Sequence, residues 1–335
     1  MSCLLLPIAA AAAVVDGVDG GGVSASAGAD ANVRPAKLCA LFPHMKDSYW
    51  LSVNQGMVEQ AQAAAAQLKV MEAGGYHNWP VQLAQFKKCQ QWGADVVLLG
   101  SVSHRLHRDI ETLVAQTPTV AMINKVDSSG VVASVGVSWQ AMGGQVGEFI
   151  NQRYSVPVKA LLMMGPKGRG GDLYLRQGIL ASVTPASFEL IGTLNGSNSV
   201  AVQRRLLRQY LQHNPAPELI VAGAVAAEVA IAELRALGLS NQVDVIATYM
   251  THAVYRGLLR GKILMANNDS MREQGRMAVQ MGLDHLQGKS LPTTLGPALM
   301  VITPQSADDW VRSSLSEPDF RPVYGVNLPS VTAKP

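Results

Sequence analysis

Aromatic residues are scarce in this sequence of 335 residues: Phe, Trp and Tyr together account for 5% of it. Cysteine is scarcer still, occurring only as Cys3, Cys39 and Cys89. So few thiols exclude a fold held together mainly by disulfides. We expect Cys39, in a strand-like run, and Cys89, in a helical pattern, to be small buried hydrophobic residues. The sequence does not determine whether these two meet.

Net charge is low as well, at +3. Lys and Arg gather only in short clusters such as RRLLR (204–208), which are typical of the solvated face of a helix, so we expect no nucleic-acid partner. Beyond the N-terminal segment no apolar run is long enough to span a bilayer, so we expect no direct membrane insertion. The chain is 48% hydrophobic, which is enough for sizeable cores, and its length suits two domains.

The N-terminal segment has a composition of its own. LLLPIAAAAAVV (4–15) has the length of the apolar part of a signal peptide, and SASAGADA (24–31) offers small residues for cleavage. We predict that residues 1–31 are a secretory signal peptide. No Lys or Arg precedes the apolar run, which leaves two alternatives: a disordered tail, or translation from another start.

Short strand-like runs alternate with helical patterns along the rest of the chain, as in βαβ units with parallel sheets. DVVLLG (95–100) and KALLMM (159–164) are apolar almost throughout, which is typical of strands covered on both faces. One series starts at residue 37, and a second starts at residue 158, after Pro157. We predict an α/β fold of two doubly wound, Rossmann-like lobes with a ligand cleft between them. The expected helices are 52–67, 80–92, 140–153, 200–212, 225–237, 252–260 and 271–287.

Five aromatic residues stand where a strand-like run leads into a helical pattern. Ligands of doubly wound lobes bind at the carboxyl ends of the strands, so these residues should converge on one cleft. Asp47 and Asp269 lie on comparable loops. The five aromatic residues are Tyr49, Trp50, Tyr76, Trp139 and Tyr249.

An aromatic cage with few acidic groups suits a small, methylated ligand with positive charge at nitrogen, because ring faces attract the cation and shed water together with the methyl groups. A sugar site would show more Asn, Asp and Arg around its rings. The alternative is that each aromatic residue packs within its own lobe, which explains any single residue as well as a cage does, but five residues less well. We expect Trp79 and Trp92 to pack in this way, and Tyr255 fits either role.

Other motifs carry less information. GPKGRGG (165–171) follows a strand but lacks both the GxGxxG spacing and a Walker lysine, so we expect a flexible turn. His104 and His107 have no further ligand at metal-site spacing and are expected to be exposed. The sequence has neither a GxSxG elbow nor paired carboxylates for acid–base chemistry. We therefore predict a binding protein without a cofactor or metal, and not an enzyme.

Several segments resemble the type I periplasmic binding proteins of the ribose-binding type. These segments are FPHMKDSYWLSVNQGMV (42–58), EAGGY (72–76), CQQWGAD (89–95), GPKGRGG (165–171), VYRGLLRGK (254–262) and ITPQS (302–306). The resemblance implies an N-terminal lobe of residues 36–137 plus 270–302 and a C-terminal lobe of residues 138–269 plus 303–325, joined by three crossings.

The resemblance is strongest to members that assist a sensor kinase in trimethylamine N-oxide (TMAO) respiration. It implies TMAO as the ligand and the periplasmic sensor domain of a membrane-bound histidine kinase as the partner. Aromatic faces can hold the three methyl groups of TMAO, and a tyrosine hydroxyl can donate to its oxygen. We assign Trp50, Tyr76, Trp139 and Tyr249 as cage walls and Tyr49 as a further wall or hydroxyl donor. Asp47 and Asp269 would face the nitrogen or orient the tyrosines.

The chain departs from sugar-binding relatives in two places. Asn124 and Lys125 stand where those relatives carry Asp-Arg, and Tyr249 stands where they carry Asp, so sugar-gripping groups are missing. We expect a periplasmic co-sensor. The alternative is the substrate-binding protein of an ABC importer for a small methylammonium or sugar-like solute, and betaine and choline remain alternative ligands. A repressor of this fold would need a helix-turn-helix before residue 36, where the sequence is Ala- and Gly-rich.

Overall fold

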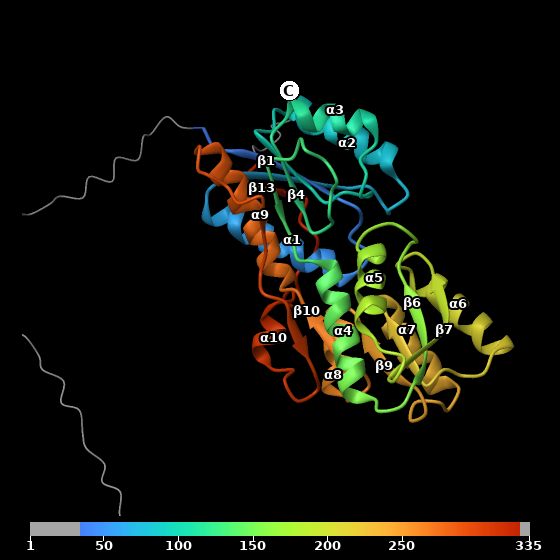
Figure 1. Ribbon diagram of the computed structural model, residues 1–335. Coiled ribbons are helices and arrows are strands. Elements are labelled where there is room, and N and C mark those ends of the chain that lie inside the picture. Colours follow the sequence, from blue (N-terminus) through green and yellow to red (C-terminus); the bar gives the residue numbers. More distant parts are fainter. Residues whose placement is uncertain (1–33, 329–335) are drawn as a thin grey trace, which may run out of the picture. The chain divides into compact units, whose positions relative to one another are not determined.

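Strands and helices alternate along the chain in the computed structural model, which describes residues 34–328 (Figure 1). The predicted signal peptide, residues 1–31, lies outside the described residues and stays a prediction. Within residues 34–328, no helix combines the length and the apolar character that crossing a membrane requires.

The strands form two sheets, and each has a core with the strand order of a doubly wound lobe. The first sheet runs β11-β5-β4-β3-β1-β2-β13 and the second runs β12-β10-β9-β8-β6-β7. Neighbouring strands are parallel except for β13 beside β2 and β12 beside β10. The first sheet comprises β1 (Lys37–Phe42), β2 (Gln67–Glu72), β3 (Val96–Leu99), β4 (Thr119–Met122), β5 (Ala133–Val135), β11 (Thr294–Leu295) and β13 (Gly325–Val326). The second comprises β6 (Val158–Met164), β7 (Phe188–Asn195), β8 (Leu219–Ala222), β9 (Asp244–Ala247), β10 (Ala266–Asn268) and β12 (Met300–Ile302).

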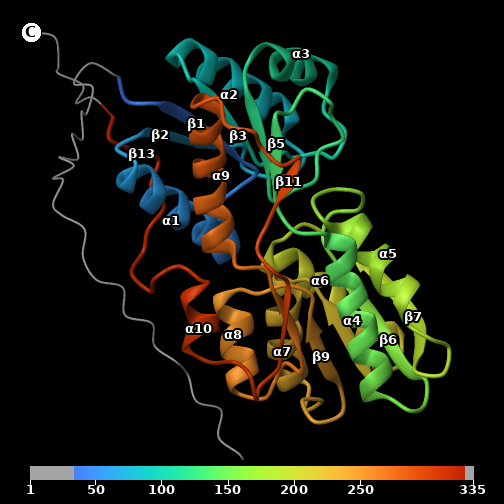
Figure 2. The same ribbon diagram turned by 60° about the vertical axis from the view of Figure 1, so that its left-hand side comes forward.

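Helices cover both faces of each sheet, which confirms the predicted fold class of two doubly wound α/β lobes (Figures 1 and 2). On the first sheet, α1 (Ser48–Ala63) and α9 (Met271–Leu286) cover one face, and α2 (Trp79–Trp92) and α3 (Arg108–Gln116) cover the other. On the second sheet, α4 (Trp139–Arg153) packs with α5 (Asp172–Ser182). The opposite layer comprises α6 (Val200–His213), α7 (Ala224–Ala236) and α8 (His252–Leu259), and α10 (Asp309–Ser313) follows β12.

Alternating side chains of β1 show why two helical layers form. Leu38, Ala40 and Phe42 belong to the large apolar cluster that includes α1 and α9, whereas Cys39 and Leu41 belong to a second cluster under α2 and α3. Because successive residues of a strand point to opposite faces, an apolar strand needs a helix on each side.

Cys39 and Cys89 are fully buried, as expected, and they form a disulfide that the sequence left open. The bond ties β1 to α2 inside the second cluster. A disulfide persists in an oxidising compartment, so this bond accords with an exported protein.

The last part of the chain departs from the predicted lobe boundaries. Residues 300–302, predicted within the N-terminal lobe, pair as β12 with β10 of the second sheet. Residues 325–326 pair as β13 with β2 of the first sheet. Within residues 34–328 the chain therefore passes between the sheets four times rather than three, after β5, β10, β11 and β12. The fourth passage arises because β13 adds an antiparallel edge to the first sheet.

Helix α1 begins at Ser48, four residues earlier than predicted. The reason is Asp47, whose carboxylate accepts hydrogen bonds from the backbone N–H groups of Tyr49 and Trp50 at 3.2 and 3.4 Å. A carboxylate at this position satisfies N–H groups that have no partner within the helix. Helices α3, α5 and α10 were not expected from the sequence.

Candidate functional site

The loops at the carboxyl ends of the strands enclose a cavity of about 570 Å³, part of it open to solvent. Its lining comes from loops of both sheets, including those after β1, β2, β4, β5, β6, β8 and β9. A site of this size suits a small molecule. Six of the seven predicted site residues line the cavity: Asp47, Tyr49, Trp50, Tyr76, Trp139 and Tyr249.

Asp269, the seventh predicted residue, lies behind the cavity wall. It is fully buried, and its Oδ2 accepts hydrogen bonds from the Tyr49 hydroxyl at 2.5 Å and from Gln274 Nε2 at 2.9 Å. It therefore orients a tyrosine, which is one of the two roles assigned to it. Because the Tyr49 hydroxyl gives its hydrogen to Asp269, it cannot donate to a ligand in this arrangement.

Trp50 is anchored within the first lobe. Its ring lies 5.0 Å from that of Phe42 between centroids, and it is 2% exposed. Gly100, directly after β3, makes room for it: a Cβ at this position would lie 2.8 Å from the indole ring. The position of this cage wall therefore depends on a glycine fifty residues away.

Tyr76 joins the two lobes. Its hydroxyl oxygen accepts a hydrogen bond from Asn124 Nδ2 at 3.3 Å, so the hydroxyl hydrogen is free to donate. Arg169, on the loop after β6 in the other lobe, donates from Nη1 to the Tyr76 carbonyl at 2.8 Å. Gly170 lies against the same ring, since a Cβ there would lie 3.4 Å from it.

Trp139 is held from both sides. Its Nε1 donates to the Ile123 carbonyl at 3.1 Å, and a Cβ at Gly171 would lie 2.1 Å from the indole ring. Ile123 has φ of 66°, in the left-handed region, which is strained for a β-branched residue. Strain of this kind gathers at functional sites, where the surrounding structure compensates for it.

Tyr249 closes the cage. Its ring stands edge-on to Tyr49 and to Trp139, with centroids 5.4 and 6.0 Å apart. The backbone N–H of Ala224, at the start of α7, opposes the rise that burial causes in the pKa of Tyr249. As in Tyr76, the hydroxyl hydrogen remains available. The cage therefore combines aromatic faces with two free hydroxyl donors.

Burial controls the ionisation of the site. It raises the pKa of Asp47 and of Asp269 above their usual values, although hydrogen bonds to each carboxylate oppose the rise. It also raises the pKa of Tyr76 to about 12 and that of Tyr249 well above its usual value. Both hydroxyl groups therefore stay protonated at neutral pH.

Another carboxylate, Asp172 at the start of α5, also lines the cavity. Burial raises the pKa of Asp172 to about 6, while the backbone N–H groups of Gly165 and Gly168 and the charge of Arg176 work against the rise. The Asn195 amide lies 3.4 Å from Asp172 Oδ2. Asp172 was not among the site residues predicted from the sequence.

GPKGRGG is also more than the flexible turn expected from the sequence. Gly165, Pro166, Arg169, Gly170 and Gly171 all line the cavity. The signal that could have identified them is the run of glycines directly after a strand, because rings from elsewhere can approach only where side chains are absent.

The remaining aromatic residues lie elsewhere. Trp79 stacks on His107 with centroids 3.8 Å apart, Trp92 lies under Lys37 and Lys69, and the Tyr255 hydroxyl donates to the Asp308 carbonyl. His104 is buried against Lys125, contrary to the expected exposure, because its ring bonds to the Lys125 carbonyl. In the described part of the chain, no group of three or more His, Cys, Asp or Glu side chains could hold a metal ion.

The fold and the interlobe cavity define a class of protein, and comparison with known families agrees. The model of the periplasmic binding protein domain matches residues 40–290, so the chain belongs to the periplasmic binding protein family. The chain is 41% identical to "Periplasmic protein TorT" of Escherichia coli (strain K12) over 293 residues, which cover 87% of this chain and 85% of that protein. The resemblance seen in the sequence is thereby confirmed.

Solved structures give the same picture. A chain of the complex between the TorS sensor domain and TorT, crystallised without ligand, superposes with a TM-score of 0.79 and 32% identity, covering 86% of this chain and 99% of that one. A chain of the same complex, crystallised in the presence of TMAO, superposes with a TM-score of 0.79 and 34% identity, with the same coverage. An ABC transporter solute binding protein from Bradyrhizobium sp. BTAi1, with bound Bis-Tris, superposes with a TM-score of 0.75 and 30% identity. The superposition covers 87% of this chain and 89% of that one.

Proposed function

We propose that this protein is a periplasmic co-sensor that binds TMAO and passes the signal to a membrane sensor histidine kinase controlling TMAO respiration. The observation that carries the proposal is the aromatic cavity between the lobes of a chain 41% identical to TorT. The proposal includes the export of the mature chain and the absence of an enzymatic activity.

Both parts of the TMAO molecule, its methyl groups and its oxygen, suit the cavity. Its methyl groups, on a positive nitrogen, are attracted to the faces of Trp50, Trp139 and Tyr249. Its oxygen is a strong acceptor, and the free hydroxyl hydrogens of Tyr76 and Tyr249 can satisfy it. In this proposal Tyr49 is a wall fixed by Asp269, and Asp47 faces the nitrogen.

In the proposed mechanism, binding of the ligand is coupled to closure of the two lobes. Cage residues come from both lobes, so TMAO makes its full set of contacts only when the lobes are closed. A ligand shifts an equilibrium only by its difference in affinity for the two states. The kinase sensor domain would then recognise the surface that closure creates, without covalent chemistry.

The test is isothermal titration of the mature chain, from about residue 32, with TMAO, in the presence and absence of the sensor domain. We expect saturable binding whose affinity the sensor domain changes, and an equal reciprocal change in affinity for the sensor domain. Trp139→Ala and Tyr76→Ala should each weaken TMAO binding about tenfold or more.

Parental affinity in both variants would disprove the cage assignment. Binding of betaine or choline in place of TMAO would change the ligand, since all three carry methylated nitrogen. If TMAO binds but the sensor domain neither binds nor alters its affinity, the substrate-binding protein of an ABC importer becomes the better assignment.

A further inference from the structure

A second hollow lies on the surface at the start of α9, outside the ligand cavity. It encloses about 680 Å³, open to solvent, and its apolar part comprises Pro297, Ala298, Met300 and Trp310. Trp310 is 51% exposed and Met300 is 41% exposed. An exposed tryptophan beside other apolar side chains is typical of a binding surface. We call this hollow the α9 groove.

The two walls of the α9 groove belong to different lobes. One wall is the first turns of α9, which packs on the first sheet with α1. The other wall is β12 and α10, and β12 pairs with β10 in the second sheet. The α9 groove therefore spans both lobes, and the Arg272 N–H ties its two walls together by donating to the Ser314 carbonyl at 3.2 Å. The relative position of the lobes is the quantity that the ligand is proposed to control.

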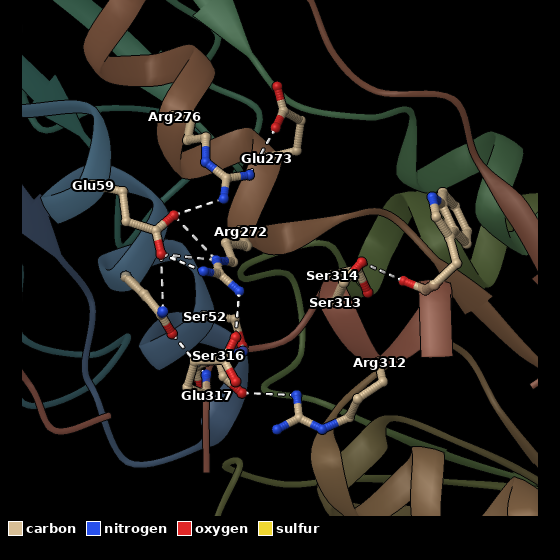
Figure 3. Close-up of polar contacts among 12 residues, drawn as sticks. Ser52, Glu59, Arg272, Glu273, Arg276, Arg312, Ser313, Ser314, Ser316 and Glu317 are labelled. Atoms are coloured by element: carbon tan, nitrogen blue, oxygen red, sulfur yellow. Dashed lines mark hydrogen bonds and ion pairs between the residues drawn. The ribbon is translucent and has the colours of Figure 1, made fainter. Parts of the chain in front are cut away.

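Charges within the α9 groove are largely neutralised. Arg272 pairs with Glu59 of α1 and, at 2.9 Å, with Glu317, and Arg276 pairs with Glu59 at 2.6 Å and with Glu273 at 3.0 Å (Figure 3). These pairs hold the arginine side chains against α1 and the chain near residue 317. Both guanidinium groups therefore already have carboxylate partners within the chain.

The rim beside Trp310 is acidic. Asp308 and Asp309 are exposed, and within residues 34–328 neither forms an ion pair. Asp308 Oδ1 caps α10 by accepting from the Val311 N–H at 3.0 Å. A complementary partner would bring an apolar side chain to Trp310 and Met300, with Lys or Arg at its edge.

The start of α9 connects one wall of the α9 groove with the residue that holds Tyr49. Ser270, which lines the α9 groove, directly follows Asp269, the residue that accepts the Tyr49 hydroxyl. Helices α1 and α9 pack backbone to backbone, since a Cβ at Gly275 would lie 2.1 Å from the Val53 carbonyl oxygen. A displacement of Tyr49 is thus transmitted through rigid elements to one wall of the α9 groove.

We infer that the α9 groove is the surface on which the kinase sensor domain docks, with Trp310 as its central contact. The inference rests on the proposed function, because it names the face that would carry the signal. The partner would present an apolar side chain flanked by basic residues, and its affinity would depend on the lobe arrangement.

The experiment measures sensor-domain affinity, with and without TMAO, for the parent chain and for Trp310→Ala and Met300→Lys. Tyr324→Ala is the matched control, since Tyr324 is 49% exposed and lies beside β13 of the first sheet. We expect the two groove variants to lose at least about tenfold in sensor-domain affinity while binding TMAO alone like the parent, and the control to behave like the parent.

Three outcomes would overturn the inference. Groove variants that bind the sensor domain like the parent would place docking elsewhere and leave the proposed function intact. A parent that binds TMAO but no sensor domain would overturn the kinase part of the proposed function together with the inference. Self-association of the parent in ultracentrifugation, abolished by Trp310→Ala, would assign the α9 groove to a second copy of this chain.

Discussion

Single glycines determine where the cage rings lie. Trp139 occupies the space that any side chain at Gly171 would need, with ring atoms 2.1 Å from the position of a Cβ. Trp50 uses Gly100 in the same way, whereas Gly223 leaves ordinary contact distance, 3.6 Å, to Tyr249. The position of a cage ring therefore also depends on a glycine in another loop.

Gly171→Ala should displace the Trp139 ring and weaken TMAO binding by about tenfold or more, because about 1.4 kcal/mol of lost contact is enough for that factor. Gly144→Ala is the control, because Gly144 does not line the cavity and its Cβ would meet only Ser182 Oγ, at 3.4 Å. Titration calorimetry measures both variants. Equal affinity of Gly171→Ala and the parent would mean that Trp139 is not a wall of the site.

Tyr49→Phe should make stability more dependent on pH. The hydroxyl helps keep buried Asp269 ionised, so its loss raises the pKa of Asp269 further above its usual value. An acid whose pKa is raised in the folded state is stabilising at low pH, and that stability is lost as pH rises through the folded pKa. The free energy of unfolding of Tyr49→Phe should therefore lie further below that of the parent at pH 7 than at pH 4.5. The deficit should be larger at pH 7 by about 1.5–3 kcal/mol.

Urea unfolding at several pH values measures this difference. Tyr154→Phe is the control, because Tyr154 also donates to a carboxylate, Asp244, at 2.6 Å, but this pair is only partly buried. A difference between Tyr49→Phe and the parent that is the same at every pH would contradict the role given to Asp269.

At the level of elements, two helix pairs pack through glycine. Gly56 and Gly275 bring α1 and α9 together, and Gly143 and Gly178 do the same for α4 and α5. In each pair, one helix precedes the second strand of its lobe: α1 precedes β2, and α5 precedes β7. The other helix, α9 or α4, follows the passage of the chain into that lobe. Because Tyr49, Trp50 and Trp139 stand in the first turns of α1 and α4, close helix packing fixes the cage.

Gly143→Ala should destabilise the protein by about 1–3 kcal/mol, the usual cost of overpacking, because its Cβ would lie 2.1 Å from the Leu175 carbonyl oxygen. Gly144→Ala is a control one residue away on the same helix, where the nearest atom would be 3.4 Å from the Cβ. That variant should match or exceed the parent, since Ala favours a helix. Denaturant unfolding of both variants separates packing from helix propensity.

At the level of the whole molecule, contacts of single side chains join the two lobes on one side of the cleft. Arg169 donates to the Tyr76 carbonyl, and Lys125 lies 4.7 Å above the ring of Tyr174. Such contacts can break without exposing a core, as reversible closure requires.

Arg169→Ala should favour the open arrangement, weaken TMAO binding and enlarge the radius of gyration in small-angle scattering at subsaturating TMAO. Lys167→Ala, an exposed neighbour on the same loop, is the control and should resemble the parent. If scattering and TMAO affinity are the same in all three proteins, the Arg169 contact has no part in closure.

The sequence alone determined the fold class and six residues of the cavity lining. Both follow from local patterns: apolar strands covered on two faces alternate with helices, and parallel strands bring their carboxyl ends to one edge. Asp47 is predictable in the same way, as a carboxylate before the first turn of a helix.

Only the tertiary structure decided the rest. Three features join residues that are 32 to 220 positions apart: the Cys39–Cys89 disulfide, the space that Gly100 and Gly171 leave for indole rings, and the place of Asp269 behind Tyr49. No local pattern encodes such pairs, because each depends on how whole helices and sheets pack together. The α9 groove, with one wall from each lobe, exists for the same reason only in the folded chain.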